Sequence, residues 1–286
     1  MIGRGMSGER DTLQAYADEV ARRPTFGDGV RIFTDSMMRF RLSGPPLINK
    51  LLGHDVRFRT VCFTLWLHYG FDDRHRNEGA TYTRLLELIR GTLGGSQKVV
   101  STTLQLMLSM EFATLEPSRT DRRVKFYRPT PRMIEAVRTW LAGVFLSLDV
   151  VDPAGRRSER LRAGDDVLLA FIRNVGCSFR DGETLTGRAP RFSCFFDREG
   201  GWPFLAIAIR SVYADGALPS LGEIAARFGF SKTQMSVIAA EGVERGFLLK
   251  DARGRLHATP ELRDYYEHWT AICFAFFLRA TPPAEG

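Results

Sequence analysis

A chain of 286 residues is long enough for two domains that each bury a core, and 44% hydrophobic with 26% charged residues is typical of a globular protein. No apolar run reaches the roughly 18 residues of a transmembrane helix, and the strongest candidate, 271–278, is predicted to be a buried helix face. The N-terminus is too polar for a signal peptide, so we expect a cytoplasmic protein.

The net charge of +7 suits a polyanionic partner, and its distribution favours one half of the chain. Residues 1–150 carry 22 Lys and Arg against 16 Asp and Glu, a net charge of +6. Residues 151–286 carry 18 against 17, a net charge of +1. The first half is therefore the better candidate for contact with a nucleic acid.

In the first half, hydrophobic periodicity predicts three helices, a β-hairpin and a further helix. Gly94 and Gly95 interrupt the chain before the third helix, and Ser96 is placed to cap it. The predicted elements are helices over 56–69, 81–91 and 97–110, strands over 112–115 and 124–127, and a helix that starts at Thr130-Pro131.

The same order recurs in the second half as a faint internal repeat. Residues 83–115 align with 218–250 at a constant offset of 135 with six identities, among them Gly94 with Gly229 and Ser96 with Ser231. The predicted elements of this second copy are helices over 202–214, 221–228 and 231–245, a shorter hairpin over 247–257, and a helix over 260–279.

Three helices followed by a β-hairpin is the winged-helix arrangement. We therefore expect a mainly α-helical fold with small β-hairpin wings: a tandem winged helix-turn-helix with a pseudo-twofold internal repeat. The predicted divisions are an N-terminal helix or tail over 1–26, a first winged-helix domain over 27–150, a linker over 151–163, a second winged-helix domain over 164–280 and a tail over 281–286.

The first wing carries a sequence that resembles a known family. Asp121-Arg122-Arg123, followed after six residues by Thr130-Pro131, resembles the Asp-Arg-Arg-x-x-x-x-x-Leu-Thr-Pro stretch of the MarR family of bacterial regulators, with Pro129 where leucine is usual. The resemblance covers residues 56–145 well and 200–280 loosely. MarR-like proteins are homodimers of single winged-helix chains, so the resemblance implies a fused pseudo-dimer whose interface involves the helices near Trp140 and Trp269; a further homodimer stays open.

An α-helix fits the major groove of B-DNA, and short polar side chains at its N-terminal end reach base edges. In the first copy, the candidates for DNA contact on the third helix are Gln97, Lys98, Ser101, Thr102 and Gln105. On the wing, Arg122 or Arg123 would enter a narrow minor groove, and the family pattern implies that Asp121 holds that arginine. The remaining basic residues of the wing, predicted to neutralise phosphates, are Arg119, Lys125 and Arg128.

The second copy offers fewer basic residues, and its contact with DNA is an open alternative to a role in packing alone. Its candidates are Lys232, Thr233, Gln234 and Ser236 on the helix, with Arg253 and Arg255 on the wing. For both copies the competing interpretation of the arginines is a solvated hairpin. Two winged helices with different contact residues would suit an asymmetric DNA site, whereas a homodimer favours a palindrome.

Nothing in the sequence predicts catalysis, a bound metal or a cofactor. The glycine-rich start 3–8 follows no strand, and Asp72, Asp73, His75 and Glu78 share a loop without a fixed geometry. The four cysteines form no Cys-x-x-Cys pair. We expect Cys62 and Cys273 to be buried, whereas Cys177 and Cys194 lie in a polar stretch and could be exposed.

The family resemblance also implies a small aromatic effector near the dimerisation helices. The aromatic side chains that could line its pocket are Phe63, Trp66, Tyr69 and Trp140, although such a stripe is more often core. The leading hypothesis is a DNA-binding transcriptional regulator and not an enzyme. A plasmid-type replication initiator, which also joins two winged helices, and an adaptor that binds protein instead of DNA are the alternatives.

Overall fold

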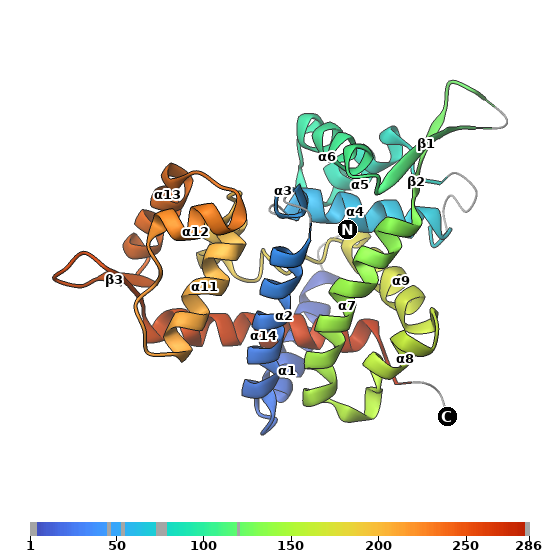
Figure 1. The fold of residues 1–286 in the computed structure, drawn as a ribbon. Coiled ribbons are helices and arrows are strands. Elements are labelled where there is room, and N and C mark those ends of the chain that lie inside the picture. Colours follow the sequence, from blue (N-terminus) through green and yellow to red (C-terminus); the bar gives the residue numbers. More distant parts are fainter. Residues whose placement is uncertain (1–4, 45–46, 53–54, 73–78, 119–120, 284–286) are drawn as a thin grey trace.

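The computed structural model describes residues 5–44, 47–52, 55–72, 79–118 and 121–283. These residues are mainly helical, with two small antiparallel two-stranded sheets (Figure 1), as the sequence predicted. No helix in these ranges is long and apolar enough to cross a membrane.

The first half contains α1 (Gly5–Ala21), α2 (Phe26–Ser43), α3 (Leu47–Leu51), α4 (Asp55–His68), α5 (Tyr82–Leu93), α6 (Gln97–Ser109), β1 (Ala113–Pro117), β2 (Lys125–Pro129) and α7 (Pro131–Val151). The second half contains the 3₁₀ turn η1 (Pro153–Gly155), α8 (Arg157–Ala163), α9 (Asp166–Arg180), η2 (Pro190–Phe192), α10 (Ser193–Phe196), α11 (Gly201–Tyr213), α12 (Leu221–Phe228), α13 (Lys232–Glu244), β3 (Leu248–Lys250), β4 (Leu256–Ala258) and α14 (Pro260–Ala280).

The order of three helices, a hairpin and a long helix occurs in both halves, and the same signals set the boundaries. Gly94 and Gly229 end α5 and α12 in the left-handed conformation, with φ of 63° and 73°. Thr130 and Thr259 cap α7 and α14, each with proline at the next position. The ends of these elements were predicted to within a few residues because the capping residues can be recognised from the local sequence.

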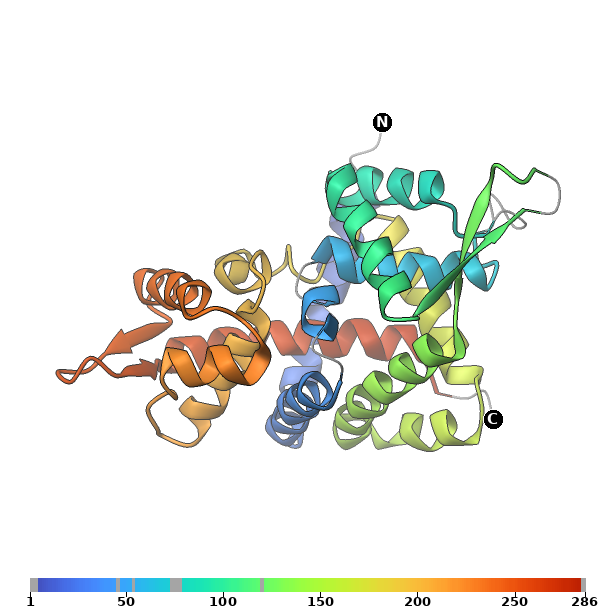
Figure 2. The same ribbon diagram turned by 45° about the horizontal axis from the view of Figure 1, so that its top comes forward.

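The two halves interlock through their outer helices. Helix α2 packs on α7 and also reaches α11 of the other half, whereas α9 packs on α14 and reaches α4. In the same way α1 lies on α14 and α8 lies on α7. Figure 1 and Figure 2 show α14, in red, running from the second hairpin behind α2 towards α7 and α8, so that one helix contacts both halves.

Close approach of α9 and α4 depends on one glycine. A Cβ atom at Gly176 would lie 2.2 Å from the Trp66 ring, so any side chain there would push these helices apart. Around this contact the halves share aromatic packing: the ring centres of Trp140 and Phe277 lie 6.3 Å apart, and those of Phe58 and Phe179 lie 6.2 Å apart. The expected interface near Trp140 is thus present, and the core is continuous between the halves.

The segment 151–163, predicted as a linker, is instead structured around a buried arginine. Arg157 is 1% exposed and donates hydrogen bonds to Thr281 Oγ1 at 2.9 Å and Asp152 Oδ2 at 2.8 Å. Its guanidinium lies against Gly155, where a Cβ atom would be 1.8 Å from Nη1. The prediction failed because the partner Thr281 is 124 residues away in sequence, and charged segments are usually exposed.

Replacing Arg157 with methionine should lower the free energy of unfolding by about 3 kcal/mol, because the change leaves Asp152 and Asp149 without their buried cation. Urea denaturation measures this. Arg162→Met, on the exposed side of the same helix, is the control and should change stability by no more than about 0.5 kcal/mol. Equal effects of the two substitutions would contradict the assigned role of Arg157.

Candidate nucleic-acid interface

Helix α6 separates an apolar face from a polar face. Val100, Leu104 and Met107 are buried against the rest of the first half. Ser96 caps the helix by accepting a hydrogen bond from the Val99 amide at 3.3 Å. The predicted contact residues Gln97, Lys98, Ser101, Thr102 and Gln105 are all exposed. The polar face is therefore free of the other half of the molecule.

The hairpin β1–β2 follows α6 directly, and its strands pair from Ala113 with Pro129 to Pro117 with Lys125. Arg122, Arg123 and Lys125 are exposed near its tip, and none of the three forms an ion pair with a described residue. Three exposed cations on a projecting hairpin, with no acidic partner among the described residues, are available to a polyanion.

The other two basic residues predicted on the first hairpin, Arg119 and Arg128, differ from Arg122, Arg123 and Lys125. Arg119 lies outside the described residues. Arg128 is partly exposed and already engaged, with Nε 3.6 Å from Glu116 Oε2 and its guanidinium over the Phe126 ring at 5.1 Å. Arg128 would have to leave Glu116 before it could neutralise a phosphate.

Asp121 was expected to hold Arg122 or Arg123 in position, and in the structure it contacts the backbone of Arg123. Its Oδ1 accepts a hydrogen bond from the backbone amide of Arg123 at 2.9 Å, as in an Asx turn. The expected Asp–Arg side-chain pair occurs in the second hairpin, where Asp251 Oδ2 accepts from Arg255 Nε at 2.8 Å. The Arg255 backbone amide, followed by the His257 and Arg255 side chains, holds the pKa of Asp251 well below its usual range.

The corner between α6 and β1 has a counterpart between α13 and β3. Glu111 ends α6 with a left-handed φ of 57°, and Gly246 occupies the equivalent place with φ 78°. The carbonyl oxygens of these two residues accept hydrogen bonds from Thr130 and Thr259, at 2.6 and 2.8 Å respectively. Each of these threonines therefore fixes the start of a long helix to the end of the helix before the hairpin.

Helix α13 exposes Lys232, Thr233 and Ser236 as predicted, but Gln234 has a structural role. Its Oε1 accepts from the Ser231 backbone amide at 2.9 Å, while the Ser231 hydroxyl accepts from the Gln234 amide, which completes a capping box. The Ser-x-x-Gln spacing could have revealed this. On the second hairpin Arg253 is exposed, whereas Arg255 is paired with Asp251.

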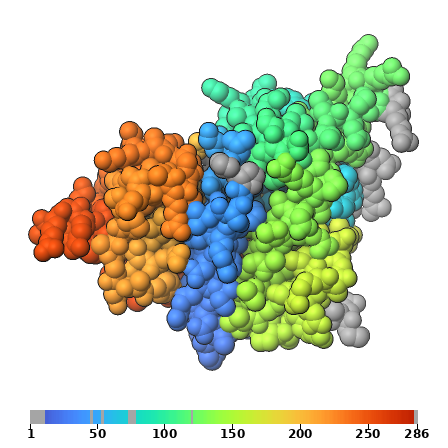
Figure 3. Space-filling model, viewed as in Figure 1, coloured from blue at the N-terminus to red at the C-terminus, as the bar shows by residue number. Residues whose placement is uncertain are grey.

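Two exposed positions of α13 were missed. Val237 and Ala240 lie 135 residues after Thr102 and Gln105 and are exposed like them, so the constant offset is the signal that would have found them. Both helices lie on the upper side in Figure 1, and the two hairpins extend to opposite sides of the molecule there and in Figure 3.

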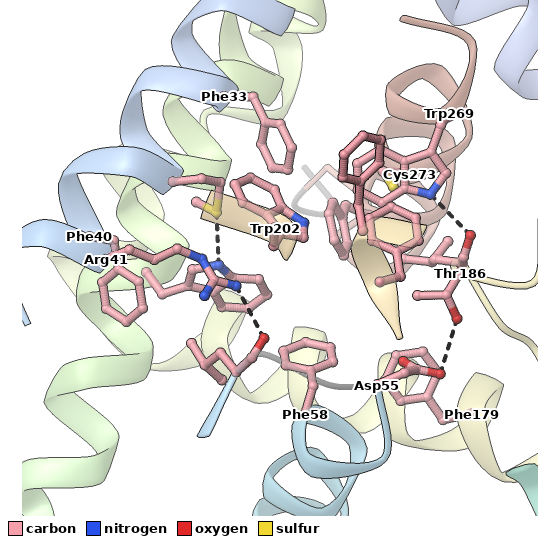
Figure 4. A pocket seen from close by; sticks show the side chains of 17 residues that line it. Phe33, Phe40, Arg41, Asp55, Phe58, Phe179, Thr186, Trp202, Trp269 and Cys273 are labelled. Atoms are coloured by element: carbon pink, nitrogen blue, oxygen red, sulfur yellow. Dashed lines mark hydrogen bonds between the residues drawn. The ribbon is translucent and has the colours of Figure 1, made fainter. Parts of the chain in front are cut away.

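A cavity of about 130 Å³ lies where the two halves meet (Figure 4). Of the aromatic residues predicted to line a pocket, Trp140 does so; Phe63 and Trp66 are buried elsewhere and Tyr69 stacks on Phe71. The lining residues are Phe33, Met37, Phe40, Arg41, Leu52, Asp55, Phe58, Trp140, Phe179, Leu185, Thr186, Phe195, Phe196, Trp202, Trp269, Cys273 and Phe277.

Two ionisable residues interrupt the aromatic lining of the cavity. Arg41 is buried with its guanidinium 5.0 Å from the centre of the Trp202 ring, and Nη2 donates to the Leu52 carbonyl at 3.1 Å. Burial lowers the pKa of Arg41 to about 10, so its charge persists at neutral pH. Asp55 accepts a hydrogen bond from Thr186 at 3.1 Å and pairs with the buried Arg59.

The four cysteines are partly or fully buried, and Asp72 of the acidic loop is ion-paired. Cys194 is buried and Cys177 half-buried, contrary to the expectation that both could be exposed, because α9 and α10 pack into the core. Burial raises the pKa of Cys194 to about 11 and that of Cys62 to about 12. Asp72 is ion-paired with Arg84, and Asp73, His75 and Glu78 lie outside the described residues, within which no cluster could hold a metal.

No protein-family model, curated protein or solved structure matches the chain. The assignment of function therefore rests on the residues and geometry of the chain itself.

Because Glu111 adopts a conformation that L-residues disfavour, Glu111→Gly should raise the free energy of unfolding by about 0.5–1 kcal/mol, despite the loss of its exposed pairing with Arg132. Gly246→Ala is the reciprocal change and should destabilise by about 1 kcal/mol. Thermal or urea unfolding of the two variants measures both effects. If Glu111→Gly proved destabilising, the corner would not be strained as described.

Proposed function

We propose that this protein is a sequence-specific, double-stranded-DNA-binding transcriptional regulator of the MarR-like type, acting in the cytoplasm as a fused pseudo-dimer of two winged helices. The observation that carries the proposal is a capped helix, α6, whose polar face is exposed, joined to a hairpin that bears exposed cations. This combination offers one surface with both hydrogen-bonding groups and positive charge, which duplex recognition requires.

In this proposal α6 enters the major groove. The amides of Gln97 and Gln105 suit adenine, and the Lys98 ammonium suits guanine or a phosphate. The hairpin then crosses the backbone, with Arg122 or Arg123 in the adjacent minor groove and Lys125 on a phosphate. The Asx turn at Asp121 supports this assignment because it orders the backbone that presents both arginines.

The proposal of a tandem winged helix with a pseudo-twofold axis is supported by the reciprocal contacts of the halves. The two largest sets of contacts between the halves have counterparts with the halves exchanged: α2 with α11 and α9 with α4, or α1 with α14 and α8 with α7. The single bridges Thr81–Phe126 and Ala217–His257 add a third short strand segment to each hairpin in the same place. A single chain would then present two recognition helices, α6 in the first half and α13 in the second.

A plasmid-type replication initiator is the second candidate, and the inequality of the hairpins favours it. The first hairpin has five-residue strands and the exposed cations Arg122, Arg123 and Lys125, whereas the second has three-residue strands, and its Arg255 is paired with Asp251. Unequal halves suit a directional site. Direct repeats of the bound sequence in a replication origin would select the initiator, and one site in a promoter would select the regulator. Capture of a protein partner with no duplex bound at low salt would select the adaptor.

We include a small aromatic effector in the proposal, bound in the cavity between the halves. An apolar cavity of about 150 Å³ accommodates a benzene ring, and this one is of similar size with aromatic walls from both halves. Arg41 supplies a buried cation at its edge, which suits an acceptor or anionic group on the ring.

The double variant Arg122→Ala/Arg123→Ala should weaken duplex binding at least about tenfold and make the dependence of log K on log salt shallower by about one to two. Fluorescence anisotropy with a selected duplex over a salt series measures both. The matched control is Arg156→Ala/Arg162→Ala, two exposed arginines at α8, far from α6 in Figure 1. Unchanged affinity and slope in the hairpin variant would remove the hairpin from the interface.

Benzoate or phenol at a concentration about a hundredfold above Kd should raise stability by about 2.7 kcal/mol and quench tryptophan fluorescence, since Trp140 and Trp202 line the cavity. Cys273→Met fills the cavity and should abolish this stabilisation, whereas Cys177→Met, outside it, should not. Thermal shift assays compare the variants. Equal stabilisation of both would place the ligand elsewhere.

A further inference from the structure

The exposed faces of α6 and α13 occupy the same register. The exposed residues are Gln97, Lys98, Ser101, Thr102 and Gln105 in the first N-capped helix, and Lys232, Thr233, Ser236, Val237 and Ala240 in the second. Each pair is separated by 135 residues, and each helix has 13 residues after a capping serine. Each exposed side chain of α6 therefore has a counterpart at the same position of α13.

The central stripe of each face differs in polarity. Residues at i, i+4 and i+7 lie along one side of a helix. In α6 this stripe is Lys98, Thr102 and Gln105, which carry an ammonium, a hydroxyl and an amide. In α13 the equivalent stripe is Thr233, Val237 and Ala240, which all carry methyl groups and no charge.

Val237 is an exposed apolar side chain without an internal function. It is 41% exposed, whereas the neighbouring Met235 and Ile238 are at most 1% exposed and face the core. The polar groups beside it are partly occupied: Gln234 is held in the capping box, and the Ser236 hydroxyl donates to the Lys232 carbonyl at 3.0 Å. The exposed groups of α13 that could contact a DNA groove are therefore mainly the methyl groups of Thr233, Val237 and Ala240, with Lys232 beside them.

In the major groove only one base presents an apolar group, the C5-methyl of thymine. We propose that α13 reads thymine by contact of Val237, flanked by Thr233 and Ala240, with C5-methyl groups, while α6 reads its half of the site by polar contacts. This inference rests on the proposed duplex binding. It makes the bound sequence asymmetric, with a methyl-dependent half under the less basic unit.

The test uses the full chain and a duplex selected from random DNA, oriented by footprinting. Each thymine is replaced in turn by uracil, which keeps the base pair and lacks only the methyl group. Replacement of at least one thymine beneath α13 should weaken binding about three- to tenfold. With Val237→Ala, this difference between thymine and uracil should fall below about twofold, whereas Thr102→Ala should leave it intact.

The outcomes separate this inference from the function on which it rests. If the protein binds duplex but uracil is tolerated at every position beneath α13, or if Val237→Ala keeps the full methyl effect, the inference is wrong and the proposed function stands. If no duplex is bound, both fall. Since Val237 is exposed, Val237→Ala should melt within a few degrees of the unchanged protein, and a melting curve checks that the variant is folded.

Discussion

The crossing of α9 over α4, with Gly176 directly against Trp66, is the contact on which the rest of the structure depends. It brings a helix of the second half onto the first helix of the unit that carries α6. The reciprocal crossing of α2 over α11 does the same for the other unit. Without these exchanges, each unit would leave an apolar helix face exposed to water, and the aromatic rings around Trp140 and Phe277 would have no partners from the other half.

The interlocked core also determines what the outer surfaces can do. Because the outer helices satisfy the packing between the halves, the polar faces of α6 and α13 are left free, and both hairpins project from the molecule. A helix and a hairpin can recognise a duplex only if their relative position is fixed. The hydrogen bond from Thr130 to the Glu111 carbonyl fixes it in the first unit, and Thr259 with Gly246 fixes it in the second.

Sequence reasoning succeeded where the determinants are local. Ser96, Gly94 and Thr130-Pro131 mark helix ends through capping, and those ends were placed to within a few residues. It failed where partners are distant in sequence. Arg157 could not be recognised as buried because Thr281 completes its site, and the cavity forms only when helices from both halves, among them α2, α4, α10 and α14, converge. The roles of Asp121 and Gln234 were missed for a different reason: each side chain has a plausible external partner but accepts a hydrogen bond from the backbone amide of a near neighbour, Arg123 and Ser231 respectively.

Helix α14 begins at the end of the second hairpin and finishes beside Arg157, and its 21 residues make it about 30 Å long. Its cavity-facing residues Trp269, Cys273 and Phe277 are spaced by four and run from its middle towards its C-terminal end. A straight helix transmits a tilt applied along this stretch to both ends. A small displacement at the cavity would therefore alter the separation of α6 and α13, the two helices proposed to contact DNA, and a duplex with a fixed helical pitch tolerates little error in that spacing.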